Sequence, residues 1–264
     1  MVHKFKDIVW NAISRTFYGL YERKLLKDIN GKPVPHHIGI IIDGNRRFAE
    51  RLGFTINKGH VAGRDKLEEV LQWCTDIGIR VITVYAFSTE NFDRSPDEVS
   101  SLMELFTQSF RKFAKDERVH KNEIRIRAIG MVDRLPADVR EAIEEAEEVT
   151  KDYNKFFLNV AIAYGGRQEL LEAIRDIAGE VRDGVTKIDE IDEQLISKHL
   201  YTSDLPDPDL ILRTSGEERV SNFLLWQSAY SELYFAEALW PEFGDIDFLR
   251  AIKSYQRRKR RYGR

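Results

Sequence analysis

The sequence predicts one α/β domain with a central, mainly parallel β-sheet of about six strands surrounded by helices. Two observations support this prediction: short apolar runs alternate with long helical patterns, and no internal repeat or low-complexity linker interrupts the 264 residues. The composition agrees, because 42% hydrophobic and 32% charged residues are ordinary for a globular protein. A chain of this length can bury a substantial core.

The predicted strands are short apolar runs of the kind that a buried parallel sheet requires. They cover residues 38–42, 81–87, 124–129, 157–163, 210–213 and 233–235. Helical spacing between them predicts helices over 58–77, 96–119, 136–153, 166–182, 191–200 and 245–258. Breakers such as Gly78, Ser95-Pro96 and Gly165-Gly166 bound these stretches.

Residues 1–34 are expected to form an N-terminal amphipathic helical extension, followed by a catalytic domain over 35–264. Apolar residues recur at helical spacing among basic ones, at Val9, Ile13, Phe17 and Leu20, before the breaker at 30–33. This pattern is compatible with a helix on a membrane surface and with a helix packed on its own domain or a partner subunit. We favour packing, because any surface helix shows such amphipathicity.

The bulk numbers exclude several classes of protein. A formal net charge of −3 argues against a surface built to bind nucleic acid, so any anion site must be local. The single Cys74 excludes an intramolecular disulfide, fits a reducing compartment and lies in an apolar run typical of a core. No apolar run of about 18 residues and no signal-peptide stretch is present, so we expect a cytoplasmic protein.

Polar segments follow four of the predicted strands at their carboxyl ends, where open parallel sheets bind ligands. They are Asp43-Gly44-Asn45-Arg46-Arg47, Ser88-Thr89-Glu90-Asn91, Tyr164-Gly165-Gly166-Arg167 and Arg213-Thr214-Ser215-Gly216-Glu217. We therefore expect these segments to cluster around one site.

The segment from Asp43 to Arg47 combines a carboxylate, a glycine, an amide and two guanidiniums. Such a loop can hold a divalent cation together with a polyphosphate, because glycine allows close backbone approach and arginine forks match phosphate oxygens. A plain turn is the competing interpretation, since Asp-Gly-Asn is common in turns, but the arginines weaken it. The commonest nucleotide-binding motifs, Gly-x-x-x-x-Gly-Lys-Ser/Thr and Gly-x-Gly-x-x-Gly, are absent.

Other candidates keep two interpretations each. His60 is either a phosphate donor or a structural hydrogen-bonding residue. Phe87 and Phe92 either form part of the core or lie beside the apolar part of a substrate. Arg213 suits a second diphosphate, or it forms a surface pair with Glu217 or Glu218 worth about 0 to 1 kcal/mol.

Three ordered segments resemble the cis-prenyltransferase family, and within it the archaeal branch. They run from His37 to Arg47, from Tyr85 to Phe92, and from Arg213 to Glu217 and on through Trp226 to Glu232. The resemblance spans about Pro35 to Gly263 and is very specific. It implies a homodimer with an apolar tunnel leading from the diphosphate sites, and not the all-helical trans-prenyl synthase fold, whose Asp-Asp-x-x-Asp motif does not occur here.

The activity that the resemblance implies is a magnesium-dependent prenyl transfer in isoprenoid biosynthesis. Isopentenyl diphosphate would condense repeatedly with farnesyl or geranylgeranyl diphosphate, giving a long-chain polyprenyl diphosphate that serves as precursor of a glycosyl carrier lipid. Because the implied product is strongly apolar and the N-terminal helix is amphipathic, we also expect a peripheral contact with the membrane. No nucleic-acid partner is implied.

The resemblance also implies roles for single residues. Asp43 is the essential acid and works with Mg²⁺, while Glu232 is a metal-linked carboxylate. Asn91 matches the position assigned to proton removal, and because an amide is a poor base we expect it to position groups instead. The implied substrate-binding residues are Gly44, Asn45, Arg46, Arg47, Phe48, His60, Ser88, Thr89, Glu90, Phe92 and Arg94, with Arg213, Arg219, Val220 and Ser221 forming the isopentenyl diphosphate pocket. Arg261-Tyr262-Gly263 resembles an Arg-x-Gly element that reaches the partner's active site.

Three positions depart from the pattern of the bacterial members. Arg46 replaces a common glycine, Ile56 stands where those members carry a phosphate-binding arginine, and Glu218 replaces a metal-associated histidine. Arg46 is expected to supply the charge that Ile56 lacks, and a carboxylate suits Mg²⁺ as well as an imidazole does.

Three rival functions follow from the same residues. A noncatalytic subunit of this fold is disfavoured by Asp43 together with both arginine clusters. An enzyme acting on nucleotides or sugar phosphates is disfavoured by the missing phosphate-loop motifs. An RNA-binding protein relying on the basic tail at 257–264 is disfavoured by the acidic overall balance.

Overall fold

The structure, a computed structural model, describes residues 18–258 and contains one six-stranded sheet. The strands are β1 (His37–Ile41), β2 (Val81–Ser88), β3 (Ile124–Ile129), β4 (Phe156–Tyr164), β5 (Leu210–Arg213) and β6 (Glu232–Phe235). The helices are 18–29, α2 (Asn45–Arg51), α3 (Ile56–Ile77), α4 (Pro96–Phe113), α5 (Glu117–Lys121), α6 (Ala137–Thr150), α7 (Gly166–Arg182), α8 (Glu193–Lys198) and α9 (Asp245–Arg257). Short 3₁₀ turns include η1 (Thr89–Asp93).

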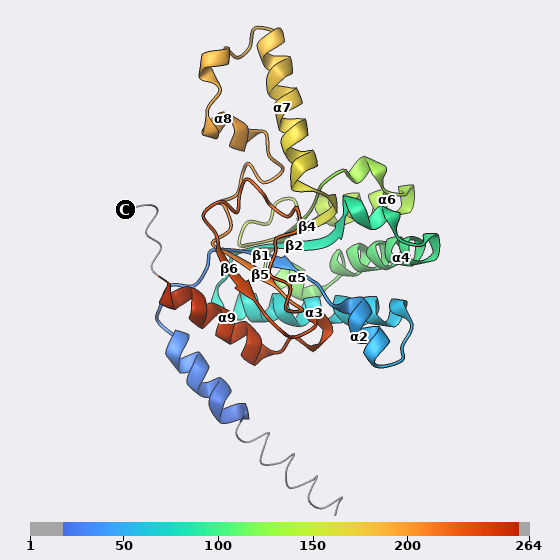
Figure 1. Cartoon of the computed structure of the whole chain (residues 1–264), viewed down its shortest axis with the longest axis vertical. Helices are drawn as coiled ribbons and strands as arrows, with labels where there is room; N and C mark the ends of the chain where they lie inside the picture. The colour runs from blue at the N-terminus through green and yellow to red at the C-terminus, as the bar shows by residue number, and fades with distance from the viewer. Residues whose placement is uncertain (1–17, 259–264) are drawn as a thin grey trace, which may run out of the picture.

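The strand order is β3-β4-β2-β1-β5-β6, and every pair is parallel (Figure 1). The predicted α/β fold is therefore confirmed. Ile41 at the end of β1 is in register with Tyr85 of β2 on one side and Arg213 of β5 on the other. The residues that follow β1, β2 and β5 consequently emerge side by side at one edge of the sheet.

Two details of the helices differ from the prediction. The stretch predicted as one helix over 96–119 is two, α4 and α5, and Asp116 begins the second by accepting a hydrogen bond from the Arg118 backbone N–H at 2.8 Å. Helix α2 was not predicted, because its seven residues follow a turn-like Asp-Gly-Asn sequence and are too few to show a helical period.

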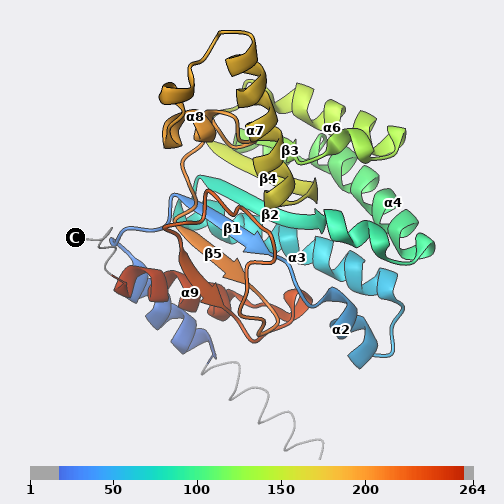
Figure 2. The same ribbon diagram turned by 45° about the horizontal axis from the view of Figure 1, so that its top comes forward.

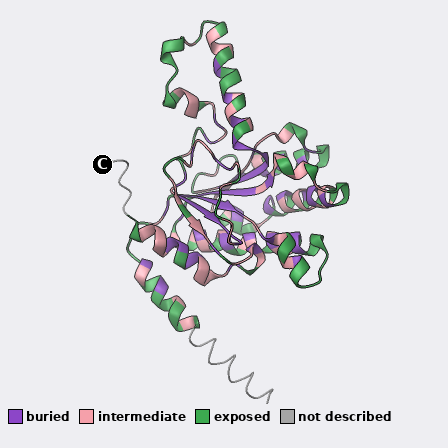
Figure 3. Cartoon of the chain, in the orientation of Figure 1, coloured by how far each residue is buried: buried purple, intermediate pink, exposed green. Residues whose placement is uncertain are grey.

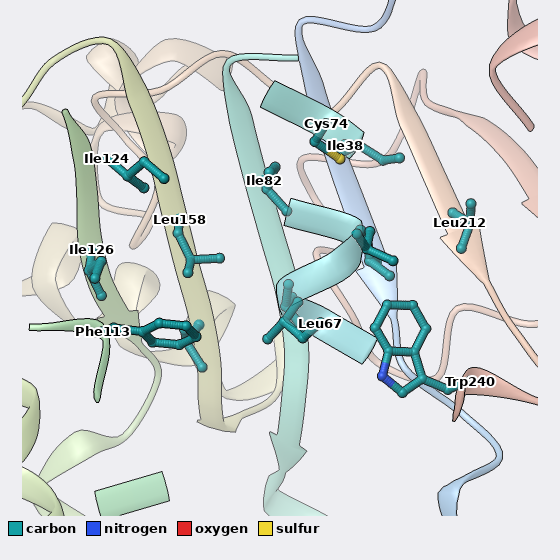
Figure 4. Close-up of a cluster of buried hydrophobic side chains, with 14 of the residues drawn as sticks. Ile38, Leu67, Cys74, Ile82, Phe113, Ile124, Ile126, Leu158, Leu212 and Trp240 are labelled. Carbon is teal, nitrogen blue, oxygen red and sulfur yellow. The ribbon is translucent and has the colours of Figure 1, made fainter. Parts of the chain in front are cut away.

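The two faces of the sheet carry different layers (Figure 2). Side chains alternate along a strand, so Ile38 and Ile40 of β1 join the large core under α3, α4, α6 and α9, whereas Ile41 faces the opposite side. Figure 4 shows this large core, in which Cys74 of α3 lies fully buried near Ile38. This position confirms the prediction of Cys74 as core filler, and burial raises the pKa of its thiol.

The opposite face is covered by the loop that follows β5 and by the base of α7, with Tyr85, Tyr164 and Phe223 packed together. From this base α7 and α8 extend away from the body of the molecule as an arm, defined here as residues 166–198 (Figure 1). Exposed and half-buried side chains predominate along the arm, whereas the strands are mostly buried (Figure 3).

Helix 18–29 packs on its own domain. Leu25 and Ile29 are buried in the large core, and Asp28 accepts a hydrogen bond from Lys253 of α9. The remainder of the predicted N-terminal helix, and the Arg261-Tyr262-Gly263 element, lie outside the described residues. Within residues 18–258, none of the helices has both the length and the apolarity needed to cross a membrane.

Candidate functional site

A cavity of about 910 Å³ opens at the carboxyl ends of β1, β2 and β5. Its lining combines charged and apolar residues from α2, α3, η1, α4 and the loop after β5. The lining residues are Ile41, Ile42, Asp43, Gly44, Asn45, Arg46, Arg47, Glu50, Phe54, Ile56, His60, Tyr85, Ala86, Phe87, Ser88, Glu90, Asn91, Arg94, Leu102, Arg213, Arg219, Ser221 and Asn222. Three of the four polar segments expected to cluster do meet here, whereas Tyr164 to Arg167 does not line the cavity.

Asp43 is the half-buried carboxylate where β1 leads into α2. Its Oδ2 accepts a hydrogen bond from Arg213 Nη2 at 2.8 Å, and its Oδ1 lies 3.6 Å from Arg47 Nη2. Burial by itself raises the pKa of Asp43, but hydrogen bonds from Arg213 and Ser215 and the charges of the arginines outweigh burial and lower it. Asp43 is therefore held as a carboxylate between two guanidiniums.

Gly44 makes this turn possible. It has a φ of 113°, a conformation that L side chains rarely adopt, and a Cβ added there would lie 3.0 Å from the Leu239 Cα.

Thr214 binds the backbone of Asp43 on both sides. The Asp43 backbone N–H donates to Thr214 Oγ1 at 3.0 Å, and that hydroxyl donates to the Asp43 carbonyl oxygen at 2.6 Å. The chain at Asp43 is thus fixed to the loop after β5.

Arg213 is buried, at 4% exposure, and organises the side of the cavity next to β5. Its Nη1 donates to the Arg219 carbonyl oxygen and to Ser221 Oγ, both at 2.6 Å. Arg213 pairs with Asp43 rather than with Glu217, which instead contacts Arg219 at 2.5 Å. The surface-pair interpretation of Arg213 is therefore wrong.

A second group of basic residues, two arginines and a histidine, surrounds Glu98 in the first turn of α4. Glu98 Oε1 lies 3.0 Å from Arg94 Nη1, 3.2 Å from His60 Nε2 and 3.8 Å from Arg46 Nε. Burial lowers the pKa of His60 despite the nearby carboxylate. Glu98 was not singled out from the sequence, although its position four residues after Arg94 is a recognised spacing for a helical ion pair.

Asn91 and Ser88 belong to the local structure of η1. Asn91 Oδ1 accepts a hydrogen bond from the Ser88 backbone N–H at 3.1 Å, so the side chain of Asn91 closes the start of this turn. Thr89 donates to Glu90 Oε2 at 3.2 Å, and Glu90 in turn lines the cavity.

Several of the predicted site residues do not line this cavity: Phe48, Thr89, Phe92, Val220 and Glu232. Phe92 packs edge-on against Phe87, with ring centroids 4.9 Å apart. Glu232 begins β6 opposite Leu210, at the far end of β5 from Arg213, and its Oε2 lies 2.7 Å from Arg258 Nη1. Within a single chain the structure does not bring Glu232 to Asp43.

The donor set for a metal is small. No group of three or more His, Cys, Asp or Glu side chains that could hold a metal occurs within residues 18–258. Mg²⁺ in phosphate-handling sites is commonly held by one or two carboxylates together with substrate phosphates and water. The carboxylate of Asp43, flanked by guanidiniums that would bind phosphate, fits a metal of that kind.

Comparison with known proteins agrees with this geometry. A family model described as putative undecaprenyl diphosphate synthase matches residues 41–263. A tritrans,polycis-undecaprenyl-diphosphate synthase (geranylgeranyl-diphosphate specific) of Thermoplasma acidophilum is 56% identical over 245 residues, covering 93% of this chain and 95% of that protein. The synthase of the same name from Pyrococcus abyssi is 53% identical over 264 residues and covers 100% of both chains.

A solved structure shares the fold as well. Lavandulyl diphosphate synthase from Lavandula x intermedia, in complex with dimethylallyl diphosphate, superposes with a TM-score of 0.83 at 36% identity, covering 88% of this chain and 99% of that one. The parallel sheet, the paired arginine clusters and these matches lead to one conclusion: the chain belongs to the cis-prenyltransferases, the family described as putative undecaprenyl diphosphate synthases, and to its archaeal branch.

Proposed function

We propose that this chain extends geranylgeranyl diphosphate by repeated cis addition of isopentenyl units, giving a long-chain polyprenyl diphosphate. One observation above all supports this: the Asp43 and Arg213 pair lies in a cavity whose lining combines two groups of basic residues with apolar residues such as Ile41, Tyr85 and Leu102. Two diphosphate heads and a hydrocarbon chain require these features. The names of the archaeal relatives support geranylgeranyl diphosphate over farnesyl diphosphate as the primer.

The two groups of basic residues are assigned to the two substrates. Arg46, Arg94 and His60 line the cavity around Glu98 and are assigned, with Arg47, to the allylic diphosphate. Arg213, Arg219 and Ser221 are assigned to isopentenyl diphosphate. Asp43 lies between them, within reach of both Arg47 and Arg213.

In the proposed reaction, the C1–O bond of the allylic diphosphate breaks and the isopentenyl double bond supplies the electrons for the new C–C bond. The adduct then loses a proton, so one diphosphate and one proton leave in each cycle. The arginines stabilise charge on the departing diphosphate, and Asn91 helps to hold the η1 segment in place. Mg²⁺ held by Asp43 would add charge neutralisation on the same diphosphate.

A homodimer is part of the proposal, because the arm exposes apolar side chains that a monomer would leave in water. The most exposed of these side chains are Ile188 at 76% and Val185 at 74%. They are followed by Ile174 at 57%, Leu171 at 50% and Ile191 at 41%. A second copy is the occupant that would cover these side chains, and it would also bring its own C-terminal tail.

Peripheral membrane contact is the last part of the proposal, together with use of the product as a glycosyl carrier lipid. Helix 18–29 turns Arg23, Lys24 and Lys27 to solvent, next to the exposed Leu20. A basic helix face of this kind is attracted to anionic lipid. Co-sedimentation with anionic vesicles tests this part alone when the full chain is compared with a triple variant, Arg23→Gln, Lys24→Gln and Lys27→Gln, because these three side chains are exposed and the buried Leu25 and Ile29 stay in place.

The enzyme assay combines the purified full chain with radiolabelled isopentenyl diphosphate, Mg²⁺ and allylic primers of 10, 15 or 20 carbons. We expect label in butanol-extractable lipid, most with the 20-carbon primer, and none after EDTA until Mg²⁺ is restored. Absence of label with every primer would refute the enzymatic function and leave the noncatalytic subunit. Preference for the 15-carbon primer would refute only the assignment of geranylgeranyl diphosphate.

A further inference from the structure

Asn222 connects three segments that are far apart in the sequence. Its carbonyl oxygen accepts a hydrogen bond from the Gly166 backbone N–H at 2.7 Å, and its Oδ1 accepts one from the Arg167 N–H at 2.9 Å. Its Nδ2 donates to Glu90 Oε1 at 3.2 Å and to Gln168 Oε1 at 3.3 Å. One side chain thus ties the loop after β5 to the start of α7 and to η1.

The contacts with α7 satisfy backbone N–H groups that a helix start leaves without intrahelical partners. Gly165, the residue preceding α7, has no side chain that could cap the helix. Asn222, which lies 55 residues after Arg167 in the sequence, caps the start of α7 instead. The approach is close: a Cβ on Gly165 would lie 2.8 Å from Asn222 Nδ2, and one on Gly166 would lie 3.1 Å from the Asn222 carbonyl oxygen. Gln168 Oε1 would lie closer still to a Cβ on Gly165, and Leu225 Cγ, at 2.8 Å, closer still to one on Gly166, so the Gly165-Gly166 pair leaves room for Asn222 together with these two neighbours.

Asn222 also lies in a strained stretch of backbone. Ser221, Asn222 and Leu224 have φ values of 47°, 65° and 43°, in the left-handed region that costs most residues about 1 kcal/mol or more each. Such strain persists only where surrounding contacts fix it. Asparagine tolerates this conformation better than other side chains do.

The consequence for the site runs through the neighbouring residue. Ser221 Oγ accepts a hydrogen bond from Arg213 Nη1 at 2.6 Å, and Arg213 reaches Asp43 at 2.8 Å. Asn222 itself lines the cavity next to Ser221. The orientation of Ser221 and Arg213 therefore depends on how firmly Asn222 is held.

We propose that Asn222 is a positioning residue that holds the Ser221 and Arg213 pocket in its binding conformation by fastening it to α7 and to Glu90. This inference rests on the proposed function, in which that pocket takes isopentenyl diphosphate. Loss of the fastening lets the strained loop relax and weakens binding of the isopentenyl substrate. The allylic substrate, assigned to the basic residues around Glu98, is little affected.

The test compares Asn222→Gly with Asn222→Asp in the full chain. Gly keeps the backbone conformation accessible but removes the side-chain hydrogen bonds, whereas Asp keeps the acceptor for Arg167 and places a carboxylate against Glu90. We expect either variant to raise KM for isopentenyl diphosphate about tenfold, the effect of one or two lost hydrogen bonds, with KM for the allylic primer within about twofold.

A double variant tests the contact with Glu90 directly. In Asn222→Asp combined with Glu90→Gln, the amide and carboxylate exchange places, so the repulsion is removed and a hydrogen bond can form again. We expect its KM for isopentenyl diphosphate to be lower than the product of the two single effects predicts. Multiplicative effects would contradict a direct contact that acts on binding.

Asn159→Ala provides the matched control for a purely structural role. Asn159 is fully buried in β4 and donates to Thr83 Oγ1 at 3.1 Å, and it does not line the cavity. We expect this control to lower Tm and leave both KM values unchanged. The inference is overturned if the Asn222 variants lower Tm and raise both KM values in parallel, or leave KM for isopentenyl diphosphate unchanged. Failure of the unmodified chain to incorporate label would instead refute the proposed function.

Discussion

Asp43 and Arg213 are 170 residues apart in the sequence, yet Asp43 Oδ2 and Arg213 Nη2 lie 2.8 Å apart. The pairing follows from the adjacency of β1 and β5, whose register places Ile41 opposite Arg213. Because Arg213 is buried, its charge depends on Asp43 for compensation. The geometry therefore couples the proposed metal ligand to the proposed isopentenyl diphosphate pocket.

Asp43→Asn is expected to lower kcat about a thousandfold, because it removes both the metal ligand and the negative charge beside Arg213 at nearly constant size. Initial rates of isopentenyl incorporation at saturating substrates measure this loss. Asp97→Asn, at an exposed position in the first turn of α4, is the control and should match the unmodified chain. More than a tenth of the normal rate in Asp43→Asn would contradict the role of Asp43.

Arg213→Lys should raise KM for isopentenyl diphosphate by about tenfold or more. The planar guanidinium reaches Asp43, Ser221 and the Arg219 carbonyl oxygen at once, and an ammonium group on a flexible stem cannot reproduce that fork. Steady-state kinetics with each substrate varied in turn measures the effect. An equal rise in KM for the allylic primer would argue that Arg213 does not belong to one pocket.

Ile174→Asp is expected to convert the proposed dimer into a monomer, because it places a charge on the exposed apolar side of α7. Sedimentation velocity at micromolar concentration measures the change. Asp176→Asn, on the same helix and also exposed, is the matched control and should remain dimeric. An unmodified chain that sediments as a monomer would contradict the homodimer itself.

His37 is expected to make stability fall in acid. Its Nε2 lies 2.8 Å from Thr83 Oγ1 and its Nδ1 lies 2.6 Å from the Pro206 carbonyl oxygen, and burial lowers its pKa to about 4. Because the unfolded chain binds this proton near pH 6.5, the stability from His37 is complete above that pH. It is lost as pH falls from 6.5 towards 4, by about 3 kcal/mol in total.

Urea unfolding between pH 7.5 and 4.5 measures this loss, with His37→Gln as the comparison. The variant cannot bind the proton, so its stability should depend less steeply on pH, by up to about 1.4 kcal/mol per pH unit. Identical pH dependence in the two proteins would show that His37 does not titrate differently in the folded and unfolded states.

Much of the fold was determined by local sequence patterns. The period of apolar residues identified the six strands and most of the helices, because amphipathicity depends only on near neighbours in the chain. The bounds of β3, β5 and α7 match the prediction, since charged or turn-forming residues mark both ends of each. Three motifs also sufficed to identify the family, since each keeps a fixed order of polar residues at a strand end.

Only the tertiary structure decided which of these segments meet. Strand order depends on the packing of faces distant in sequence, so spacing alone did not reveal that β1 lies between β2 and β5, bringing Asp43 to Arg213. For the same reason the sequence did not reveal that Glu98 pairs with Arg94 or that Asn222 contacts the start of α7. It also did not show that Glu232 lies next to Leu210, at the end of β5 away from Arg213. The residue types determined which chemistry the site can perform, and long-range packing determined which residues come together to form it.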